Sequence, residues 1–212
     1  RGLGSSASAI VGGLALARSL VLTGEQYMSD EELITLATEL EGHPDNVAAA
    51  FYGGATIAWL ESKVGKDGAR TSTGRAVSLK VDDRIKALLL IPENQLSTAK
   101  ARKLLPETIS HQDAVLNSSR SALLVHALAE RPDLLFTATE DALHQKYREQ
   151  AMPKTIALME KLRGAGLAAV VSGAGPSVMV LYSGAEDEID QLQSVAPGFT
   201  AMKLAIAKTG VQ

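Results

Sequence analysis

The sequence predicts an α+β protein in two parts, each containing both helices and strands. Three observations support this: a 46% apolar content over 212 residues, a change of pattern near residue 84, and the order of elements after it. A chain of this length and composition can bury a sizeable core. We expect residues 1–84 to be the later part of an incomplete α/β domain and residues 85–212 to form a second domain.

Helices are expected first in the chain. The apolar positions after residue 5 can share one face, which predicts a helix from about Ser5 to Leu22. Ser29 and Glu32 have the spacing of a capping box, so a second helix is expected to begin there and to run to Glu41. Gly42 then ends it.

The rest of the first part is expected to mix a short helix with strands. Asp45 or Asn46 can cap a helix that continues through Phe51. Residues 55–60 and 77–81 are predicted strands, because apolar and β-branched residues are frequent in both. The polar stretch between them, residues 61–75, is expected to be a surface hairpin or loop.

The second part is expected to be a ferredoxin-like split βαβ domain with added helices. Its predicted order is one strand, several helices, two strands, a helix and a final strand, which is the order of that fold. The predicted strands are 85–91, 168–172, 177–182 and 199–206, and the predicted helices are 97–104, 112–129, 132–150, 154–163 and 186–195. The boundary between the two parts is expected around residues 82–84.

Composition excludes several classes of function. The chain has no cysteine, which rules out disulfides, thiolate metal sites and a cysteine nucleophile. Its four histidines lack the spacing of a zinc site. A net charge of −3 and few aromatic residues do not suit nucleic-acid binding. Arg18 interrupts the first apolar run, which therefore resembles neither a secretory signal nor a membrane span.

The opening stretch RGLGSSASAI suggests a phosphate-binding loop. Unpaired N–H groups and a partial positive charge at a helix N-terminus attract anions, and Gly2 and Gly4 would allow a phosphate to approach the backbone. Ser5 and Ser6 add hydroxyl groups. The loop matches neither the Walker pattern nor the dinucleotide-binding pattern. Such a loop normally follows a strand, so we expect a segment to precede Arg1.

Two further clusters have both a structural and a functional interpretation. Glu41 and Asp45 flank a sequence that could be only a helix end followed by a cap, or could supply a magnesium ligand and a substrate contact. The stretch 172–177, Ser-Gly-Ala-Gly-Pro-Ser, could be only a tight connection between strands, or could lie against a nucleotide or substrate. Arg102 and Arg148 could be solvated, or could clamp a carboxylate.

Together these motifs resemble the GHMP small-molecule kinases, and within them the group that phosphorylates homoserine. The resemblance rests on residues 2–7 (Gly-Leu-Gly-Ser-Ser-Ala), 41–48 (Glu-Gly-His-Pro-Asp-Asn-Val-Ala) and 172–177, with Ala-Arg-Lys-Leu-Leu-Pro at 101–106 and Tyr-Arg-Glu-Gln-Ala-Met-Pro at 147–153. It covers essentially the whole chain. The family's first motif, ending Asn-Leu-Gly-Pro-Gly-Phe-Asp, is not among these residues, and the spacing from Glu41 to His43 is shorter than in some members.

The resemblance implies a role for each candidate residue. The ATP phosphates would be bound by Gly2, Leu3, Gly4, Ser5 and Ser6, with Gly173 and Gly175 stabilising the site, and Mg²⁺ by Ser6 and Glu41. Asp45, Asn46 and His43 would contact L-homoserine, and Arg102 and Arg148 its carboxylate. Glu41 and Asp45 would be the catalytic residues, with Asp45 favoured as a group that orients the substrate hydroxyl over one that takes its proton.

The implied activity is ATP-dependent phosphorylation of L-homoserine in threonine biosynthesis, in the cytoplasm. The partner would be this small molecule, with no nucleic acid or membrane involved, and a homodimer is an open option. Two alternatives remain at this stage. One is a GHMP kinase that acts on mevalonate or a sugar; a sugar would not need two arginines for a carboxylate. The other is a regulatory module that binds a small molecule without chemistry.

Overall fold

The computed structural model describes residues 1–64, 68, 70–94, 96–97, 101–184, 186–192 and 196–211. By its internal contacts the chain divides into two compact units. One joins Arg1–Leu3 to Val81–Ile206, and the other joins Gly4–Lys80 to Ala207–Gln212. The expected domain bounds of 1–84 and 85–212 stay a prediction. No helix in the described ranges is long and apolar enough to cross a bilayer.

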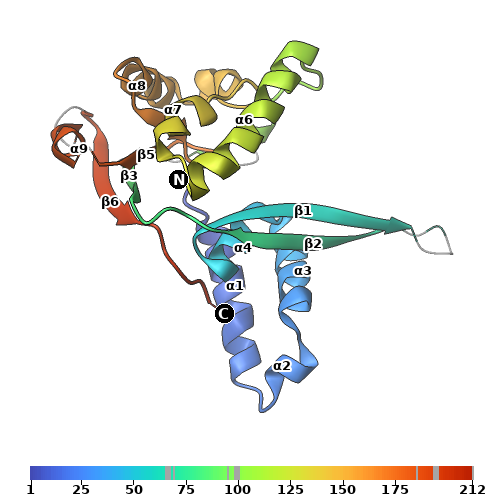
Figure 1. The fold of residues 1–212 in the computed structure, drawn as a ribbon. Helices are drawn as coiled ribbons and strands as arrows, with labels where there is room; N and C mark the ends of the chain where they lie inside the picture. The colour runs from blue at the N-terminus through green and yellow to red at the C-terminus, as the bar shows by residue number, and fades with distance from the viewer. Residues whose placement is uncertain are drawn as a thin grey trace. The chain divides into compact units, whose positions relative to one another are not determined.

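The unit that begins at Gly4 has a helical core. Its helices are α1 (Ser5–Ser19), α2 (Gly24–Tyr27), α3 (Asp30–Glu41) and α4 (Asp45–Tyr52). Helices α1 and α3 lie side by side (Figure 1), and Val11, Leu33 and Phe51 are fully buried between the helices. The capping box of Ser29 and Glu32 is confirmed, with both of its hydrogen bonds formed.

Helix α1 is shorter than expected, because it ends at Ser19 and not at Leu22. The Arg18 guanidinium donates to Asp30 at 2.6 Å, which fastens the end of α1 to the start of α3. The chain must therefore turn within a few residues. Leu20 and Leu22, which the expected helix would have carried, are 78% and 91% exposed. Helix α4 also differs, since its N-cap is Pro44 and neither Asp45 nor Asn46 caps it.

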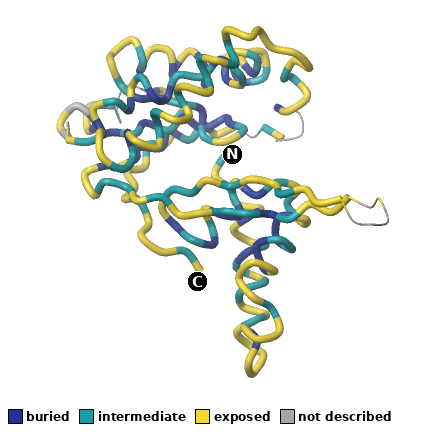
Figure 2. Tube along the Cα trace, turned by 45° about the vertical axis from the view of Figure 1, so that its right-hand side comes forward, coloured by how far each residue is buried: buried dark blue, intermediate teal, exposed yellow. Residues whose placement is uncertain are grey.

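Two long antiparallel strands complete this unit. Strand β1 (Ala55–Val64) pairs with β2 (Arg70–Leu79) along its full length, with Trp59 opposite Arg75. Of the two alternatives for 61–75, this pairing confirms the hairpin, and the strand expected at 77–81 begins earlier, at Arg70, and ends at Leu79. Serine and threonine are frequent in this stretch, and its outer part is exposed (Figure 2). It consequently lacks the apolar alternation by which a strand is recognised, although its β-branched residues favour one.

The unit that begins at Val81 contains a four-stranded sheet. Its strands are β3 (Ile85–Pro92), β4 (Ala168–Val171), β5 (Val178–Ser183) and β6 (Phe199–Ala205), in the order β4-β5-β3-β6 with every neighbouring pair antiparallel. Helices α6 (His111–Ala129) and α8 (Pro153–Gly164) precede β4, and α9 (Glu186–Leu192) precedes β6. This arrangement confirms the split βαβ fold. Its core packs Ile156 of α8 against Leu88 and Val180 of the sheet.

The single helix expected at 132–150 is broken into three short pieces. These are η1 (Pro132–Leu134), α7 (Leu135–Ala138) and η2 (Lys146–Ala151). Between α7 and η2, side chains take over the backbone hydrogen bonds that a continuous helix would use. The Asp141 carboxylate, for example, accepts from the N–H groups of His144 and Gln145 at 2.9 and 2.7 Å.

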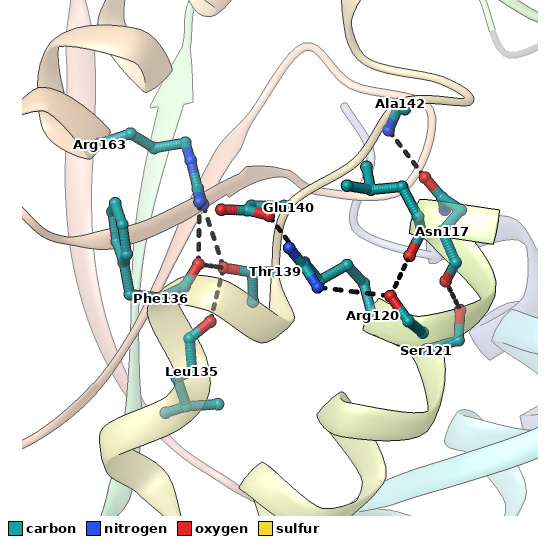
Figure 3. Close-up of polar contacts among 11 residues, drawn as sticks. Asn117, Arg120, Ser121, Leu135, Phe136, Thr139, Glu140, Ala142 and Arg163 are labelled. Carbon is teal, nitrogen blue, oxygen red and sulfur yellow. Dashed lines mark hydrogen bonds and ion pairs between the residues drawn. The ribbon is translucent and has the colours of Figure 1, made fainter. Parts of the chain in front are cut away.

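Buried and half-buried polar side chains fix the segment after α7 (Figure 3). Arg163 of α8 donates to the Thr139 hydroxyl at 3.1 Å and to the Phe136 carbonyl oxygen at 2.8 Å. Asn117 of α6 accepts from the Ala142 N–H at 2.7 Å. Helices α6 and α8 thus hold residues 139–142 from two sides. Residues 98–100 of the helix expected at 97–104, and residues 193–195 of the helix expected at 186–195, lie outside the described residues.

Candidate active site

The first residues of the chain are held by the connection between β4 and β5. The Ser172 hydroxyl donates a hydrogen bond to the Gly2 carbonyl oxygen at 2.6 Å, and the Ser177 hydroxyl donates to the Arg1 carbonyl oxygen at 2.7 Å. Gly2 has φ of +73°, and a Cβ added there would lie 2.1 Å from the Ser172 carbonyl oxygen. Position 2 therefore requires glycine both for its conformation and for space.

The β4–β5 connection is braced by its own backbone and by α8. The Ser172 N–H donates to the Ser177 carbonyl oxygen at 2.8 Å, and the Gly175 N–H donates to the Ser172 carbonyl oxygen at 2.9 Å. The Thr155 hydroxyl donates to the carbonyl oxygen of Pro176, which follows a cis peptide bond. These bonds fix the backbone that presents the two serine hydroxyls to residues 1 and 2.

Arg148 is a buried cation beside the same connection. Its side chain lies in η2, is 7% exposed, and donates through Nη1 to the Gly173 carbonyl oxygen at 3.0 Å. Its Nε is buried and has no hydrogen-bond partner among the described residues. Burial lowers the pKa of Arg148, the nearby carboxylate of Asp141 raises it, and the charge of Arg102 lowers it again. The guanidinium therefore keeps a buried N–H group that no hydrogen-bond acceptor satisfies among the described residues.

Arg102 lies close enough to Arg148 for their charges to repel, and its side chain is exposed. Two guanidinium groups held near each other, one of them buried, form a site of positive charge. Such positive charge suits a carboxylate.

In the other unit, the N-terminus of α1 is open. Gly4 is the N-cap in a left-handed conformation, no side chain caps the helix, and its first turn carries no acidic residue. Ser5 and Ser6 are exposed there. The Asn46 side chain lies against Gly4, at 3.5 Å from where a Cβ would be. The free N–H groups and the helix dipole at this end favour an anion.

Glu41, His43 and Asp45 form a small cluster between α3 and α4. The His43 ring contacts Asp45 Oδ1 through Nδ1, and its Nε2 lies 3.9 Å from Glu41 Oε1. The same Asp45 oxygen accepts from the Asn46 N–H at 2.7 Å. The Glu41 and His43 side chains are 12% and 17% exposed, whereas Asp45 is 71% exposed. His43 and the backbone thus orient an Asp45 carboxylate that faces solvent.

The sequence-predicted site residues fall into two groups. The unit that joins Arg1–Leu3 to Val81–Ile206 contains the first group: Gly2, Arg102, Arg148, Gly173 and Gly175. Leu3 belongs to the same unit and is 41% exposed. In the other unit the structure brings together Glu41, His43, Asp45 and Asn46, with Asn46 against Gly4 at the start of α1 beside Ser5 and Ser6. The roles assigned to them stay proposals.

A hollow of about 420 Å³ lies away from these residues, between Arg84, Arg131, Phe136 and Tyr182. Both arginines form bidentate ion pairs there, Arg84 with Asp82 and Arg131 with Asp133. Their charges are already compensated, in contrast to that of Arg148.

The sequence did not reveal the residues whose hydrogen bonds hold the site residues in place. Ser172 and Ser177 were recognised only as the ends of a glycine loop, because no local pattern reveals a hydrogen bond to residues 170 or more positions away. Gln145 and Asp141 gave no signal, since both fell within a stretch predicted to be one helix.

The chain is similar to known proteins in both of its halves. The model of the GHMP kinases N terminal domain matches residues 1–54, and the GHMP kinases C terminal model matches residues 119–197. Among curated proteins, a homoserine kinase of Streptomyces coelicolor is 45% identical over 99% of this chain and 65% of its own length. A homoserine kinase of Rhodococcus opacus is 48% identical over 98% of this chain and 67% of its own length.

A solved structure also resembles the chain. The homoserine kinase of Cytophaga hutchinsonii superimposes with a TM-score of 0.78 at 25% identity, covering 99% of this chain and 67% of that one. The chain spans about two thirds of the length of the curated relatives it matches. The family models and the relatives point to the same group, so the chain belongs to the GHMP kinases and, within them, to the homoserine kinase family.

Proposed function

We propose that the protein transfers the γ-phosphoryl group of ATP to the side-chain hydroxyl of L-homoserine, giving O-phospho-L-homoserine for threonine biosynthesis in the cytoplasm. The observation that carries the proposal is Arg148, a buried guanidinium with an unpartnered Nε and a second arginine nearby. An amino acid supplies the carboxylate that this pair lacks. The names of the relatives support the same substrate.

We assign the ATP phosphates to residues 2–6. The open N-terminus of α1 offers backbone N–H groups without a competing side-chain cap, and the Ser172 and Ser177 hydroxyls fix the residues just before it. Backbone donors and a helix dipole stabilise phosphate charge without needing a lysine.

The residues assigned to Mg²⁺ fit that ion. Its preferred ligands are oxygens, with one or two carboxylates joined by substrate phosphates and water. Glu41 offers a carboxylate whose nearest histidine nitrogen is 3.9 Å away, and Ser6 offers an exposed hydroxyl in the first turn of α1. The described residues contain no cluster of three or more acidic or histidine side chains that would hold a metal alone. When bound, the ion would neutralise charge on the transferring phosphoryl group.

Asp45 is assigned to the homoserine hydroxyl, with Asn46 and His43 beside it. In the reaction the hydroxyl oxygen bonds to the γ-phosphorus, the bond to the β–γ bridging oxygen breaks, and ADP leaves. The hydroxyl proton passes to the Asp45 carboxylate or to water. Because His43 and the Asn46 N–H both contact Oδ1 of Asp45, its orientation is fixed while Oδ2 stays available to accept a hydrogen bond. Phosphoryl transfer depends mainly on such alignment and on charge stabilisation.

A panel of acceptors tests the proposal in the full-length protein. With ATP and Mg²⁺ present, release of ADP is measured with L-homoserine, mevalonate and galactose. We expect turnover with homoserine alone. Preference for mevalonate or galactose would overturn the substrate assignment, and amino-acid binding without ATP binding in calorimetry would indicate a non-catalytic module.

A further inference from the structure

We propose that Gln145 is a positioning residue for Arg148 and thereby sets the preference of the site for substrates with a carboxylate. The inference rests on the proposed function, because it assigns to Arg148 the homoserine carboxylate. Gln145 is the N-cap residue of η2, the short turn that carries Arg148, and is only 8% exposed.

The side chain of Gln145 satisfies a backbone group at the edge of the sheet. Within the part of the chain that the structure describes, strand β4 is an outer strand of the sheet and pairs with β5 alone. Antiparallel strands alternate inward- and outward-facing N–H groups, and the Ser172 N–H is directed to the β5 side, at Ser177. The preceding N–H, that of Val171, therefore faces away from β5. Gln145 Oε1 accepts from it at 2.7 Å, in a buried position.

Two hydrogen bonds attach the turn that carries Arg148 to the end of β4 and to the β4–β5 connection. Gln145 binds Val171, and Arg148 binds the Gly173 carbonyl oxygen two residues later. One bond alone would let the turn pivot about it, whereas two separated bonds fix both its position and its rotation. The Arg148 N–H also donates to the Gln145 carbonyl oxygen at 3.1 Å, so the two residues move as one turn.

The other side of Gln145 is fixed as well. Its N–H donates to the Asp141 carboxylate at 2.7 Å. Asp141 follows Glu140 and precedes Ala142, within the segment that Asn117 and Arg163 hold to helices α6 and α8 (Figure 3). Gln145 therefore connects a firmly held segment to the edge of β4. These hydrogen bonds hold the Arg148 guanidinium in one position and orientation. It can therefore bind a carboxylate in one orientation, as a specific carboxylate-binding site requires.

The test compares two acceptors that differ only in the carboxylate. L-homoserine and 3-aminopropan-1-ol share the hydroxyl and the amine, and the ratio of their kcat/KM values measures what the clamp contributes. In the full-length protein, Gln145→Met keeps the length of the side chain and removes the acceptor. We expect this ratio to fall about tenfold or more, with the KM for ATP changed less than about twofold, because a misplacement of about 1 Å costs as much as 10²-fold.

Three comparisons separate positioning from a merely structural effect. Gln145→Glu retains an oxygen at the same reach and should keep most of the ratio. Gln150→Met, at an exposed position of the same turn, should leave the ratio unchanged. In wild-type protein, homoserine should slow hydrogen exchange at the Val171 amide and 3-aminopropan-1-ol should not; this measurement needs no variant to fold.

The outcomes distinguish the two proposals. Suppose that wild type phosphorylates homoserine. If Gln145→Met then keeps the wild-type ratio of the two kcat/KM values, the positioning role is wrong and the proposed function stands. The same holds if the variant loses kcat/KM equally for both acceptors and for ATP. Unchanged exchange at Val171 on homoserine binding would also overturn the positioning role. If wild type neither binds nor phosphorylates homoserine, both proposals fail.

Discussion

The Ser177 hydroxyl donates a hydrogen bond to the carbonyl oxygen of Arg1, across 176 positions of the sequence, at 2.7 Å. Ser177 is fully buried. Together with the bond from Ser172 to Gly2, it fixes the backbone that leads into the proposed phosphate loop. A contact between such distant residues links the conformation of this loop to the C-terminal half of the chain.

Removing that bond should weaken ATP binding. Ser177→Ala leaves the Arg1 carbonyl without its donor, so we expect a loss of about 1 kcal/mol in the free energy of unfolding and a rise of about threefold to tenfold in the KM for ATP. Ser118→Ala is the matched control, since that exposed hydroxyl bonds a backbone carbonyl within α6. An unchanged KM for ATP in Ser177→Ala would show that the bond does not order the loop.

A methyl group at position 2 should be more damaging. Gly2→Ala places Cβ against the Ser172 carbonyl oxygen at a positive φ, and we expect at least about a tenfold weaker Kd for ATP, with about 1–3 kcal/mol lost from unfolding. Gly13→Ala, in α1 with nothing within 4 Å of the new Cβ, should instead stabilise by about 0.5–1 kcal/mol. Calorimetry and urea unfolding measure both. Equal ATP affinity in the two variants would contradict the prediction.

Replacing Arg148 should lower kcat/KM for homoserine much more than it lowers the stability of the fold. Arg148→Met removes a buried charge but also the hydrogen bond to the Gly173 carbonyl oxygen, so we expect the free energy of unfolding to fall by no more than about 1 kcal/mol, the usual worth of one hydrogen bond. Its kcat/KM for homoserine should fall about 10²- to 10³-fold, since a buried charged contact is worth about 2–5 kcal/mol. Arg163→Met is the contrasting variant, because Arg163 bonds protein oxygens and its loss should mainly lower Tm. A large drop in Tm for Arg148→Met would indicate a structural role.

Glu41 should matter for the metal more than for folding. Glu41→Gln keeps the size of the side chain and removes its charge, so the Mg²⁺ concentration for half-maximal activity should rise about tenfold or more while the free energy of unfolding changes by less than about 1 kcal/mol. Glu39→Gln, exposed on the same helix, is the control. If turnover and stability fall in parallel, Glu41 is a structural residue.

Asp141 should make the free energy of unfolding depend on pH in the acid range. Burial raises the pKa of Asp141, but the hydrogen bonds from the His144 side chain and from the N–H groups of Gln145 and His144 outweigh it and hold the pKa well below its usual range. The carboxylate therefore contributes stability above the unfolded pKa of about 3.9, and this is lost as pH falls toward the folded value.

Urea unfolding of Asp141→Asn measures that contribution. The variant should be less stable than wild type at pH 7 by about 1–3 kcal/mol, the usual range for hydrogen bonds to a charged group. The difference should shrink as pH falls below about 4. Asp187→Asn, at an exposed position, should show no such trend. A difference that stays constant with pH would mean that the charge of Asp141 contributes nothing.

The parts of the fold that local chemistry specifies were predictable. Ser29 and Glu32 fixed the start of α3 because a capping box is complete within four residues, and Gly42 fixed its end. The order of strands in the second half followed from short apolar runs, each buried by its neighbours. The motifs of the candidate site were likewise visible, because each is a short run of unusual residues.

What could not be predicted depends on distant partners. The sequence left a hairpin and a loop open for the stretch from 61 to 75, and only the hydrogen bonds between β1 and β2 decide for the hairpin. Residues 132–150 have the composition of a helix, but the Thr139 and Asp141 side chains bond backbone groups there, and Arg163 of α8 donates to the Thr139 hydroxyl. The hydrogen bond from the Val171 N–H to Gln145 Oε1 joins residues 26 positions apart, and no local sequence pattern reveals it.

The paired strands β1 and β2 have a consequence for handling the protein. Among the described residues each strand has a single neighbour, so each leaves one long edge of backbone N–H and C=O groups unpaired. Ile57, Trp59 and Val77 are more than 40% exposed on them. Lys63 and Arg70 put positive charge near one end of the pair, and Arg75 in its middle forms ion pairs with Glu31 and Glu61. These 212 residues, produced alone, should therefore tend to self-associate by edge-to-edge strand addition and to need dilute, low-salt conditions to stay monomeric.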